Sequence, residues 1–345
     1  MPNILDHSKN KISLLVQDSY TNKIYDISHM NESITWTTSR DKAQPGTLTF
    51  LIKESVVDDG VIINPGSHVR FGVNGVSYFL GRIQAPELLN SPQDGVIYSF
   101  RANNGLDALA SEESATRIAG QKASEFFDSL MREQSARIQS FGGLPLRWAV
   151  REPSTARLSE NYYLNEPLYA MLSDSLTDTH IAEPRQYMVR DNAGVLEFRE
   201  LQALKTPYIL GDDSYAGSYV YGVDIDNSYN MIKAVRDNYE IGMRDTWHVF
   251  DSESVMRHGY KQLVVEADEQ MNDGQINDMA QLYLNALNRP NRSMRLECLG
   301  INGLQAGDGI RVQAARARID AWHWVEECTH IYTMEAHKMD LSIYV

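Results

Sequence analysis

The chain has 345 residues, of which 43% are hydrophobic and 23% charged, so wholesale disorder is excluded and two or three globular domains are expected. Its formal net charge of −14 argues against a surface that binds nucleic acid or anionic lipid, because such surfaces need a basic field. Cys298 and Cys328 are too few for a disulfide framework, which favours a reducing compartment, and no apolar run is long enough for a signal peptide or a membrane span.

Residues 1–103 are predicted to form a β domain. Short runs rich in β-branched and aromatic residues are separated by turn residues at close spacing. Asn74-Gly75 stands between two such runs and predicts a two-residue turn of type I′, which needs a positive φ at both central residues. Regularly spaced short strands favour a small barrel or sandwich. The runs are KISLLVQDS, SITWTT, GTLTFLI, HVRFGV, VSYFLGRI and GVIYSFRA.

Residues 104–206 are predicted to form a small α+β domain of two helices and a hairpin. The hairpin has Asp191-Asn192-Ala193-Gly194 at its turn. For the second helix Asn165 is expected to be the N-cap, and Pro167 stands near the start, where its missing N–H costs little. The positions at helical spacing are Ala123, Phe126, Phe127, Leu130 and Met131 in the first helix, and Leu168, Met171, Leu172, Ser175 and Leu176 in the second.

Residues 207–345 are predicted to form a second β domain with one inserted helix, at about 272–288. Asn272 and Gln275 have the spacing of a capping box, and an apolar stripe follows them. Asn288 and Pro290 end the stripe. The polar segment from Gly242 to Gly259 is expected to be an extended hairpin or a loop.

One short pattern occurs near both ends of the chain. A glycine is followed by two free positions, a β-branched aliphatic residue, an arginine and another apolar residue. The glycine permits a tight turn, and the arginine is expected to lie at the surface between two core residues. The two copies are Gly66, Val69, Arg70 and Phe71, and then Gly307, Ile310, Arg311 and Val312.

Two interpretations of this doubled motif are open. By itself the pattern is common in small β-barrels and needs no special explanation. The flanking segments also correspond, however: TLTFLI precedes the first copy and RLECLGI the second, while YFLGRIQ follows the first and WHWVEECTHIY the second. With matching flanks, two related β domains around an α+β domain become the favoured interpretation.

Sequence motifs of catalysis are missing. The chain has no G-x-S-x-G, H-E-x-x-H, G-x-x-x-x-G-K or G-x-G-x-x-G pattern. In WHWVEECTHIY, strand alternation would place Trp322, Trp324, Glu326, Cys328 and His330 on one face. Glu326, Cys328 and His330 could bind zinc, but the sequence has no second pair of ligands at zinc spacing. A strand with an aromatic face is therefore favoured over a metal site. We therefore predict no catalytic residues, no cofactor and no metal site.

Carbohydrate chemistry is the remaining alternative. Adjacent carboxylates could act as in glycosidases, but solvated surface charges are favoured. The five tryptophans could line a sugar groove, although core positions are commoner for this residue. The carboxylate pairs are Asp58-Asp59, Glu112-Glu113 and Asp212-Asp213, and the tryptophans are Trp36, Trp148, Trp247, Trp322 and Trp324.

Six stretches run nearly from end to end of the chain: ESITWTTSRDKAQPGTLTFLI, INPGSHVRFGVNGVSYFLGRI, SYVYGVDIDNSYNMIKAV, YKQLVVEADEQMNDGQINDMAQLYLNALNRP, RLECLGINGLQAGDGIRV and AHKMDLSI. In their order and spacing they resemble the baseplate hub proteins of contractile phage tails and phage-tail-like bacteriocins, in the form carried by Gram-positive bacteria. Variable loops are expected between Arg147 and Asn165.

The resemblance implies a β-rich α+β fold in which two similar, barrel-like tube domains flank a small α+β domain. Three chains would form a ring that joins a six-fold tail tube to a three-fold central spike, beside other baseplate proteins. DNA would pass through without specific binding, and no membrane is involved. The expected location is the virion or a tail-like particle, assembled in the host cytoplasm. One alternative is a carbohydrate-binding tail-tip module. The other is a cell-wall hydrolase, whose activity would be expected to reside in an added domain after Val345.

Overall fold

A computed structural model describes residues 10–40, 44–54, 60–91, 95–113, 115–118, 120–158, 160–211, 216–238, 242–269, 271–333 and 336–344. The chain forms two compact units. Unit 1 comprises Met1–Tyr219 and Arg295–Ile343, and unit 2 comprises Val220–Met294 with Tyr344–Val345. Strands make up 50% of the described residues and helices 21%, which confirms the predicted β-rich α+β class.

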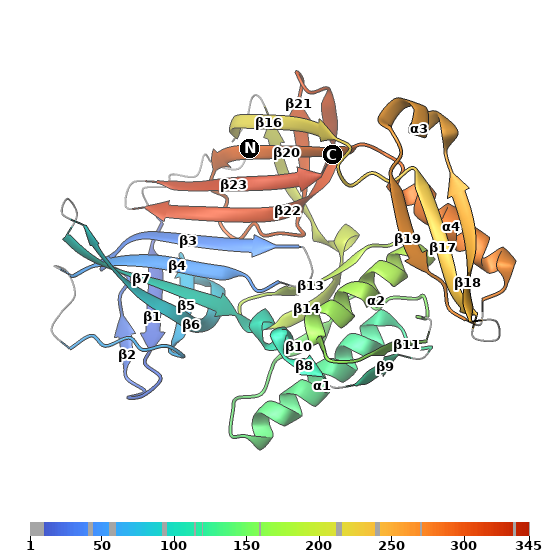
Figure 1. The fold of residues 1–345 in the computed structure, drawn as a ribbon. Coiled ribbons are helices and arrows are strands. Elements are labelled where there is room, and N and C mark those ends of the chain that lie inside the picture. The colour runs from blue at the N-terminus through green and yellow to red at the C-terminus, as the bar shows by residue number, and fades with distance from the viewer. Residues whose placement is uncertain are drawn as a thin grey trace. The chain divides into compact units, whose positions relative to one another are not determined.

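The N-terminal strands of unit 1 form one antiparallel ladder in the order β3-β4-β7-β6-β5-β1-β2 (Figure 1). In β4 every second residue is buried, because alternate side chains of a strand point to opposite faces. The core of this part contains Trp36, Phe50, Phe71 and Phe79. The strands are β1 (Ile12–Gln17), β2 (Ile24–Asp26), β3 (Asn31–Ser39), β4 (Thr47–Lys53), β5 (His68–Val73), β6 (Val76–Ser91) and β7 (Gly95–Asn104).

The tight hairpin between β5 and β6 is confirmed. Val73 pairs with Val76, and the two turn residues have φ values of 55° at Asn74 and 83° at Gly75. Both values are positive, as a type I′ turn requires.

A second set of strands from the C-terminal part of the chain follows the order β16-β20-β23-β22. β21 pairs with β22 and with β15. β22 also pairs with β3, so both sets belong to one path, and among the described residues this path does not close into a barrel. The strands are β15 (Lys205–Gly211), β16 (Ala216–Asp224), β20 (Asn291–Leu299), β21 (Gly309–Ala314), β22 (Ile319–Thr333) and β23 (His337–Tyr344).

Between these sets the chain forms the predicted two helices and hairpin. α1 and α2 pack with the small sheet β10-β14-β13 around Phe126, Phe127, Leu172 and Phe198 (Figure 1). The elements are η4 (Gly105–Ala110), β8 (Glu112–Glu113), β9 (Thr116–Ile118), α1 (Ala123–Ser140), β10 (Trp148–Val150), β11 (Asn161–Tyr163), β12 (Glu166–Pro167), α2 (Leu168–Ala182), β13 (Tyr187–Asp191), β14 (Leu196–Glu200) and η5 (Leu201–Leu204).

The predicted start of α2 was wrong. Pro167, not Asn165, is the N-cap residue, and it makes no side-chain cap hydrogen bond. Asn165 instead has a φ of 55°, a left-handed conformation that asparagine tolerates better than most residues. The pattern that suggested a cap therefore marks a turn before the helix.

Unit 2 is a three-stranded sheet, β18-β17-β19, with α4 packed on it through Ile276, Ala280 and Leu284. The capping box is confirmed, since Asn272 and Gln275 each accept a hydrogen bond from the backbone N–H of the other. The segment predicted as a hairpin or loop from Gly242 to Gly259 contains a full strand and a short helix. The elements are β17 (Met231–Asn238), β18 (Met243–Phe250), α3 (Ser252–His258), β19 (Gln262–Glu266) and α4 (Asp273–Leu287).

Candidate functional site

The first copy of the doubled motif is a turn that leads into β5. Gly66 has a φ of 83°, which a residue with a Cβ adopts only with strain. Its N–H donates to the carbonyl of Ile83 at 2.7 Å, and the N–H of Ile83 donates back to the carbonyl of Ser67 at 2.9 Å. The N–H of Ser67 also donates to the carbonyl of Asn64, at 3.2 Å. The two bonds with Ile83 fix the turn on the long strand β6, and the third closes the turn itself.

The second copy leads into β21 with the same hydrogen bonds at corresponding positions. Gly307 has a φ of 87°. Its N–H donates to the carbonyl of Val325 at 2.7 Å, and the N–H of Val325 donates to the carbonyl of Asp308 at 3.0 Å. The N–H of Asp308 donates to the carbonyl of Gln305 at 3.1 Å. Gly66 and Gly307, Ile83 and Val325, and Ser67 and Asp308 therefore correspond.

Both turns are followed by a strand with two buried residues around an arginine. Val69, Phe71, Ile310 and Val312 are fully buried. Arg70 is exposed, and its Nε donates to Ser77 Oγ at 3.3 Å. Arg311 is partly exposed and donates to the carboxylate of Asp320 at 2.9 Å. The arginines thus lie at the surface, where they bond within their own hairpin.

A β-bulge follows each turn at the same point. The register between β6 and β7 shifts between Ile83 and Ala85. The register between β22 and β23 shifts between Val325 and Glu327. Each shift begins at the residue that closes the glycine turn, and an extra residue there moves the following side chains to the other face.

A buried carboxylate supports the first turn. The Asp18 side chain accepts hydrogen bonds from the N–H of Thr21 at 2.8 Å and from the side chain of Asn64 at 2.8 Å. It also accepts a bond from the backbone N–H of Asn64 at 3.3 Å. These donors, with the backbone N–H of Thr21 first, hold the pKa of Asp18 well below its usual value.

A different carboxylate supports the second turn. Asp308 accepts a bond from the N–H of Gln305 at 2.9 Å and forms an ion pair with Arg190 at 2.8 Å. Burial raises the pKa of Asp308 above its usual value, and the charge of Arg190 offsets only part of that increase. Arg190 belongs to β13, so this turn is tied to the helix-and-hairpin region.

The aromatic strand face predicted for WHWVEECTHIY is broken by the bulge in β22. Trp322 is 37% exposed, whereas Cys328 and His330 are fully buried. Glu326 pairs with Arg40 through a 2.8 Å hydrogen bond. The extra residue puts the two halves of the strand out of phase, so the predicted single face does not exist.

The buried end of β22 contains a small polar cluster. His330 Nδ1 lies 2.9 Å from His337 Nε2, and its Nε2 lies 2.7 Å from the carbonyl oxygen of Leu304. Burial lowers the pKa of His330 to about 4 and raises that of Cys328. Across the described ranges, no group of three or more His, Cys, Asp or Glu residues could hold a metal ion.

The same end of β22 pairs with β3, a contact that sequence reasoning missed. Glu327 lies opposite Ser39 and Thr333 opposite Ser33. The His330 ring stacks on Trp36 with centroids 5.0 Å apart. The two strands are almost 300 residues apart in the chain, so no local pattern announces this pairing.

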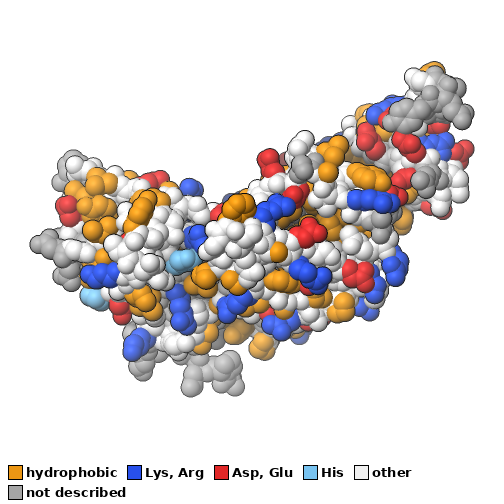
Figure 2. Space-filling model, turned by 90° about the horizontal axis from the view of Figure 1, so that it is seen from below, with side chains coloured by type: hydrophobic (Ala, Val, Ile, Leu, Met, Phe, Trp, Pro, Cys, Tyr) orange, Lys and Arg blue, Asp and Glu red, His pale blue; other side chains and the backbone are white. Residues whose placement is uncertain are grey.

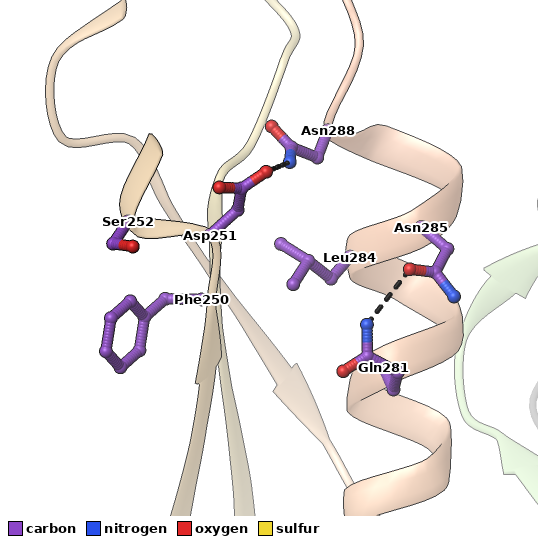
Figure 3. A pocket seen from close by; sticks show the side chains of 7 residues that line it. All are labelled: Phe250, Asp251, Ser252, Gln281, Leu284, Asn285 and Asn288. Carbon is purple, nitrogen blue, oxygen red and sulfur yellow. Dashed lines mark hydrogen bonds between the residues drawn. The ribbon is translucent and has the colours of Figure 1, made fainter. Parts of the chain in front are cut away.

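Unit 2 has a polar hollow of about 480 Å³ between the end of β18 and α4 (Figure 3). Figure 3 shows Asp251 directed at Asn288, whose amide donates to it at 2.8 Å. Asp251 also accepts bonds from two backbone N–H groups at the start of α3. Gln281 donates to Asn285 at 2.9 Å. The polar groups of the hollow therefore bond to one another and cap α3.

Surface charge is mixed on the face drawn in Figure 2. Lys and Arg side chains alternate there with Asp and Glu instead of gathering in one patch. In the part of the chain that the structure describes, no helix is both long and apolar enough to cross a membrane.

Comparisons with known proteins agree on the fold. No curated protein matches the chain. The 43 kDa tail protein of prophage MuSo2 from Shewanella oneidensis aligns with a TM-score of 0.68 at 11% identity, over 97% of this chain and 98% of that one. The tail protein from Neisseria meningitidis MC58 aligns with a TM-score of 0.67 at 11% identity, over 97% and 96%.

A third solved structure is the prophage tail protein gp18 from Listeria monocytogenes EGD-e. It aligns with a TM-score of 0.60 at 12% identity, over 96% of this chain and 94% of that one. The resemblance to tail proteins that the sequence indicated is thus confirmed by the fold. The sequence itself matches the YQBQ-like family over residues 34–344. The chain therefore belongs to the YQBQ-like family and has the fold of prophage tail proteins.

Proposed function

We propose that this chain is the structural baseplate hub of a contractile tail. Three copies form a ring in which each chain contributes two equivalent β modules. The ring then presents six similar positions to a six-fold tail tube and keeps three-fold symmetry toward a central spike. The observation that carries this proposal is the doubled glycine turn, with its matching hydrogen bonds and bulge.

The order of the strands supports the equivalence of the two modules. The first module follows β3-β4-β7-β6-β5-β1 and the second follows β16-β20-β23-β22-β21-β15. Each strand of one list has its counterpart at the same place in the other. The modules differ at one end, where β1 runs antiparallel to β5 but β15 runs parallel to β21.

The proposed partners follow from this geometry. They are two further copies of the chain, the spike protein, the tail tube protein and other baseplate proteins, in a virion or tail-like particle assembled in the host cytoplasm. Head-to-tail contacts between modules close into a ring when the rotation matches. DNA or other cargo passes through without specific binding, and the net charge of −14 favours a bore that does not retain it.

A non-enzymatic role agrees with what the described residues do. The carboxylate and the amides of the polar hollow in unit 2 bond to one another and to a helix start. Asp18 and Asp308 support turns. The names of the three similar structures describe tail proteins.

Mass photometry with the purified chain, alone and with the tail tube protein, tests the proposal. The expected particle has a mass of about 117 kDa, three times 39.1 kDa, and electron microscopy is expected to show a central bore. A monomer under all conditions would contradict the ring. Glycan-array binding or clearing on a cell-wall zymogram by that monomer would replace the hub with a carbohydrate-binding module or a hydrolase.

A further inference from the structure

We propose that β16 of one copy pairs with the outer half of β6, Ala85–Ser91, of the next copy. This joint would be antiparallel and would repeat between chains the pairing that β3 and β22 make within one chain. The inference rests on the proposed ring and names the surfaces that would close it.

The pattern for the joint is visible inside unit 1. β22 pairs with β21 only as far as Trp324. Beyond the bulge its other half has β23 on one side and β3 on the other. That half is well covered, and Cys328 and His330 have no exposed surface.

The corresponding half of β6 lacks its second neighbour. β6 pairs with β5 only as far as Arg82 and with β7 over its whole outer half. β5 lies on one side of β6 up to Arg82 and β7 on the other. Beyond Arg82, within the described ranges, no strand pairs with Ala85–Ser91 on the side where β5 ends. Leu88 is 60% and Leu89 47% exposed there, whereas the matching positions in β22 lie in a covered half-strand.

β16 is the matching open edge. β3, its counterpart, has β4 on one side and β22 on the other. β16 has β20 on one side and stands at the end of the described strand path. Val220 is 70% and Val223 56% exposed. An open strand edge with apolar side chains is a surface that pairs readily with another chain.

Equivalent positions in the first module follow from its strand pairings. Ile34 of β3 lies opposite Phe50 of β4. Phe50 lies opposite Phe100 of β7, and Phe100 lies opposite Pro86 of β6. This row of residues crosses the module from its edge strand to its long strand.

The same row can be traced through the second module. Cys328, which corresponds to Pro86, lies opposite Leu341 of β23. The N–H of Gly300 donates to the carbonyl of His337 at 2.9 Å, and counting along the two antiparallel strands from that bond places Leu296 opposite Leu341.

The row ends on β16. Ser218 Oγ donates to the carboxylate of Glu297 at 2.9 Å, so these two residues face each other across β16 and β20. The next position on each strand then places Tyr219 opposite Leu296. Tyr219 is therefore the counterpart of Ile34.

The register of the joint follows. Ile34 pairs with Tyr332 within the chain, and Tyr332 corresponds to Asn90. Tyr219 of one copy is thus placed opposite Asn90 of the next, and Val220 opposite Leu89. Val220 and Leu89, which are both exposed in the single chain, would then cover one another. Such an apolar contact stabilises cross-strand pairs.

Pro86 makes the joint selective. The N–H of Arg40 donates to the carbonyl of Glu326 at 2.8 Å, so alternate residues of β22 from Glu326 onward direct their backbone groups at β3. Pro86 corresponds to one of these residues, Cys328, and has no N–H to donate. The joint therefore has one hydrogen bond fewer than the pairing of β3 with β22 within the chain. A proline at an open strand edge also discourages pairing with unrelated strands.

A disulfide trap tests the joint. The double variant Leu89→Cys/Val220→Cys is first assembled into the ring. Mild oxidation is then expected to form a disulfide between the cysteine introduced at position 220 of one copy and that introduced at position 89 of the next, and non-reducing electrophoresis should show covalent dimers and trimers. The native cysteines are buried, with Cys298 6% and Cys328 0% exposed. The matched control is Leu88→Cys/Val220→Cys, in which a shift of one residue places the two thiols on opposite faces.

The outcomes separate the joint from the ring. A trimer by mass photometry that gives no covalent product, or that links equally well in the control, overturns the joint and leaves the hub intact. Absence of any assembly, with and without the tube protein, overturns the ring and the joint together. Circular dichroism of both double variants, compared with the unsubstituted chain, confirms that they are folded.

Discussion

The turns at Gly66 and Gly307 each have a backbone N–H that donates to a carboxylate, but the two carboxylates come from different places. At Gly66 it is Asp18, which follows the end of β1, and at Gly307 it is Asp308, which belongs to the turn itself. The N–H of Asn64 donates to Asp18, and the corresponding N–H of Gln305 donates to Asp308. The positive φ, the backbone bonds to the long strand and the bulge are the same in both. The shared requirement is thus on the main chain, and the side chains beneath it meet that requirement in different ways.

The surroundings of the two glycines differ as well. A Cβ at Gly66 would lie 3.7 Å from that of Ser19, an ordinary contact. A Cβ at Gly307 would overlap the sulfur of Met188, which is buried. Replacement of Gly66 is therefore opposed by its backbone conformation alone, and replacement of Gly307 by its backbone conformation and by packing.

The largest expected effect separates the two glycines. Gly66→Ala should destabilise the protein by roughly 1–2 kcal/mol, the cost of a left-handed conformation with a Cβ. Gly307→Ala should lose about 1–3 kcal/mol more, because overpacking is added. Urea unfolding followed by circular dichroism measures both.

A second substitution sharpens that comparison. Gly307→Ala should cost less stability in a Met188→Ala background than in the unsubstituted chain, because the atom that the new Cβ meets is then absent. The cost of Gly66→Ala should be the same in both backgrounds. Equal losses in the two single variants would show that packing does not distinguish the turns.

The two carboxylates should respond to acid in opposite directions. The folded-state pKa of Asp18 is lowered, so its contribution to stability is present above the ordinary carboxyl pKa and is lost as the pH falls. The pKa of Asp308 is raised, so its ionisation opposes folding at neutral pH, and this penalty disappears on acidification.

Melting temperatures between about pH 7 and pH 2 test this, because carboxylates of the unfolded chain titrate within that range and folded Asp18 titrates lower still. The advantage of the unsubstituted chain over Asp18→Asn should shrink as the pH falls. The melting temperature of the unsubstituted chain relative to that of Asp308→Asn should instead rise as the pH falls. If both differences change in the same direction, the assigned surroundings of one carboxylate are wrong.

The smallest effect is expected at the two arginines. Arg70 bonds to Ser77 and Arg311 to Asp320 at the surface of their hairpins. Exposed pairs of this kind contribute little, because water and salt screen them. Arg70→Ala and Arg311→Ala should leave the melting temperature unchanged within error. A clear loss for either would give the arginine a role that its contacts do not explain.

Local features were largely predictable from sequence. The positive φ values at Asn74 and Gly75 follow from the turn chemistry of that pair, and the Asn272–Gln275 capping box follows from spacing alone. The inward faces of α1 and α2 follow from helical periodicity. In each case the signal and the structure lie within a few neighbouring residues.

Features that depend on distant residues were not predictable. The bulge after Val325 reverses the alternation that the sequence of β22 suggests, and nothing local marks the extra residue. Arg40 and Glu326 meet only because β3 and β22 pair across the chain. The segment from Gly242 to Gly259 is polar because one face of β18 and most of α3 are exposed. Its polarity predicts an extended hairpin or a loop, and it does not separate the strand, which pairs antiparallel with β17, from the short helix.

The segment between β16 and β20 begins and ends at neighbouring points, since Asn291 Nδ2 donates to Asp224 Oδ1 at 3.3 Å. The corresponding strands of the first module, β3 and β4, are joined by a short connection, Arg40–Gly46. A chain with a short glycine-containing turn in place of 225–290 should therefore retain the melting transition of unit 1. Unit 2 is then a cassette that could be replaced without altering the scaffold into which it is inserted.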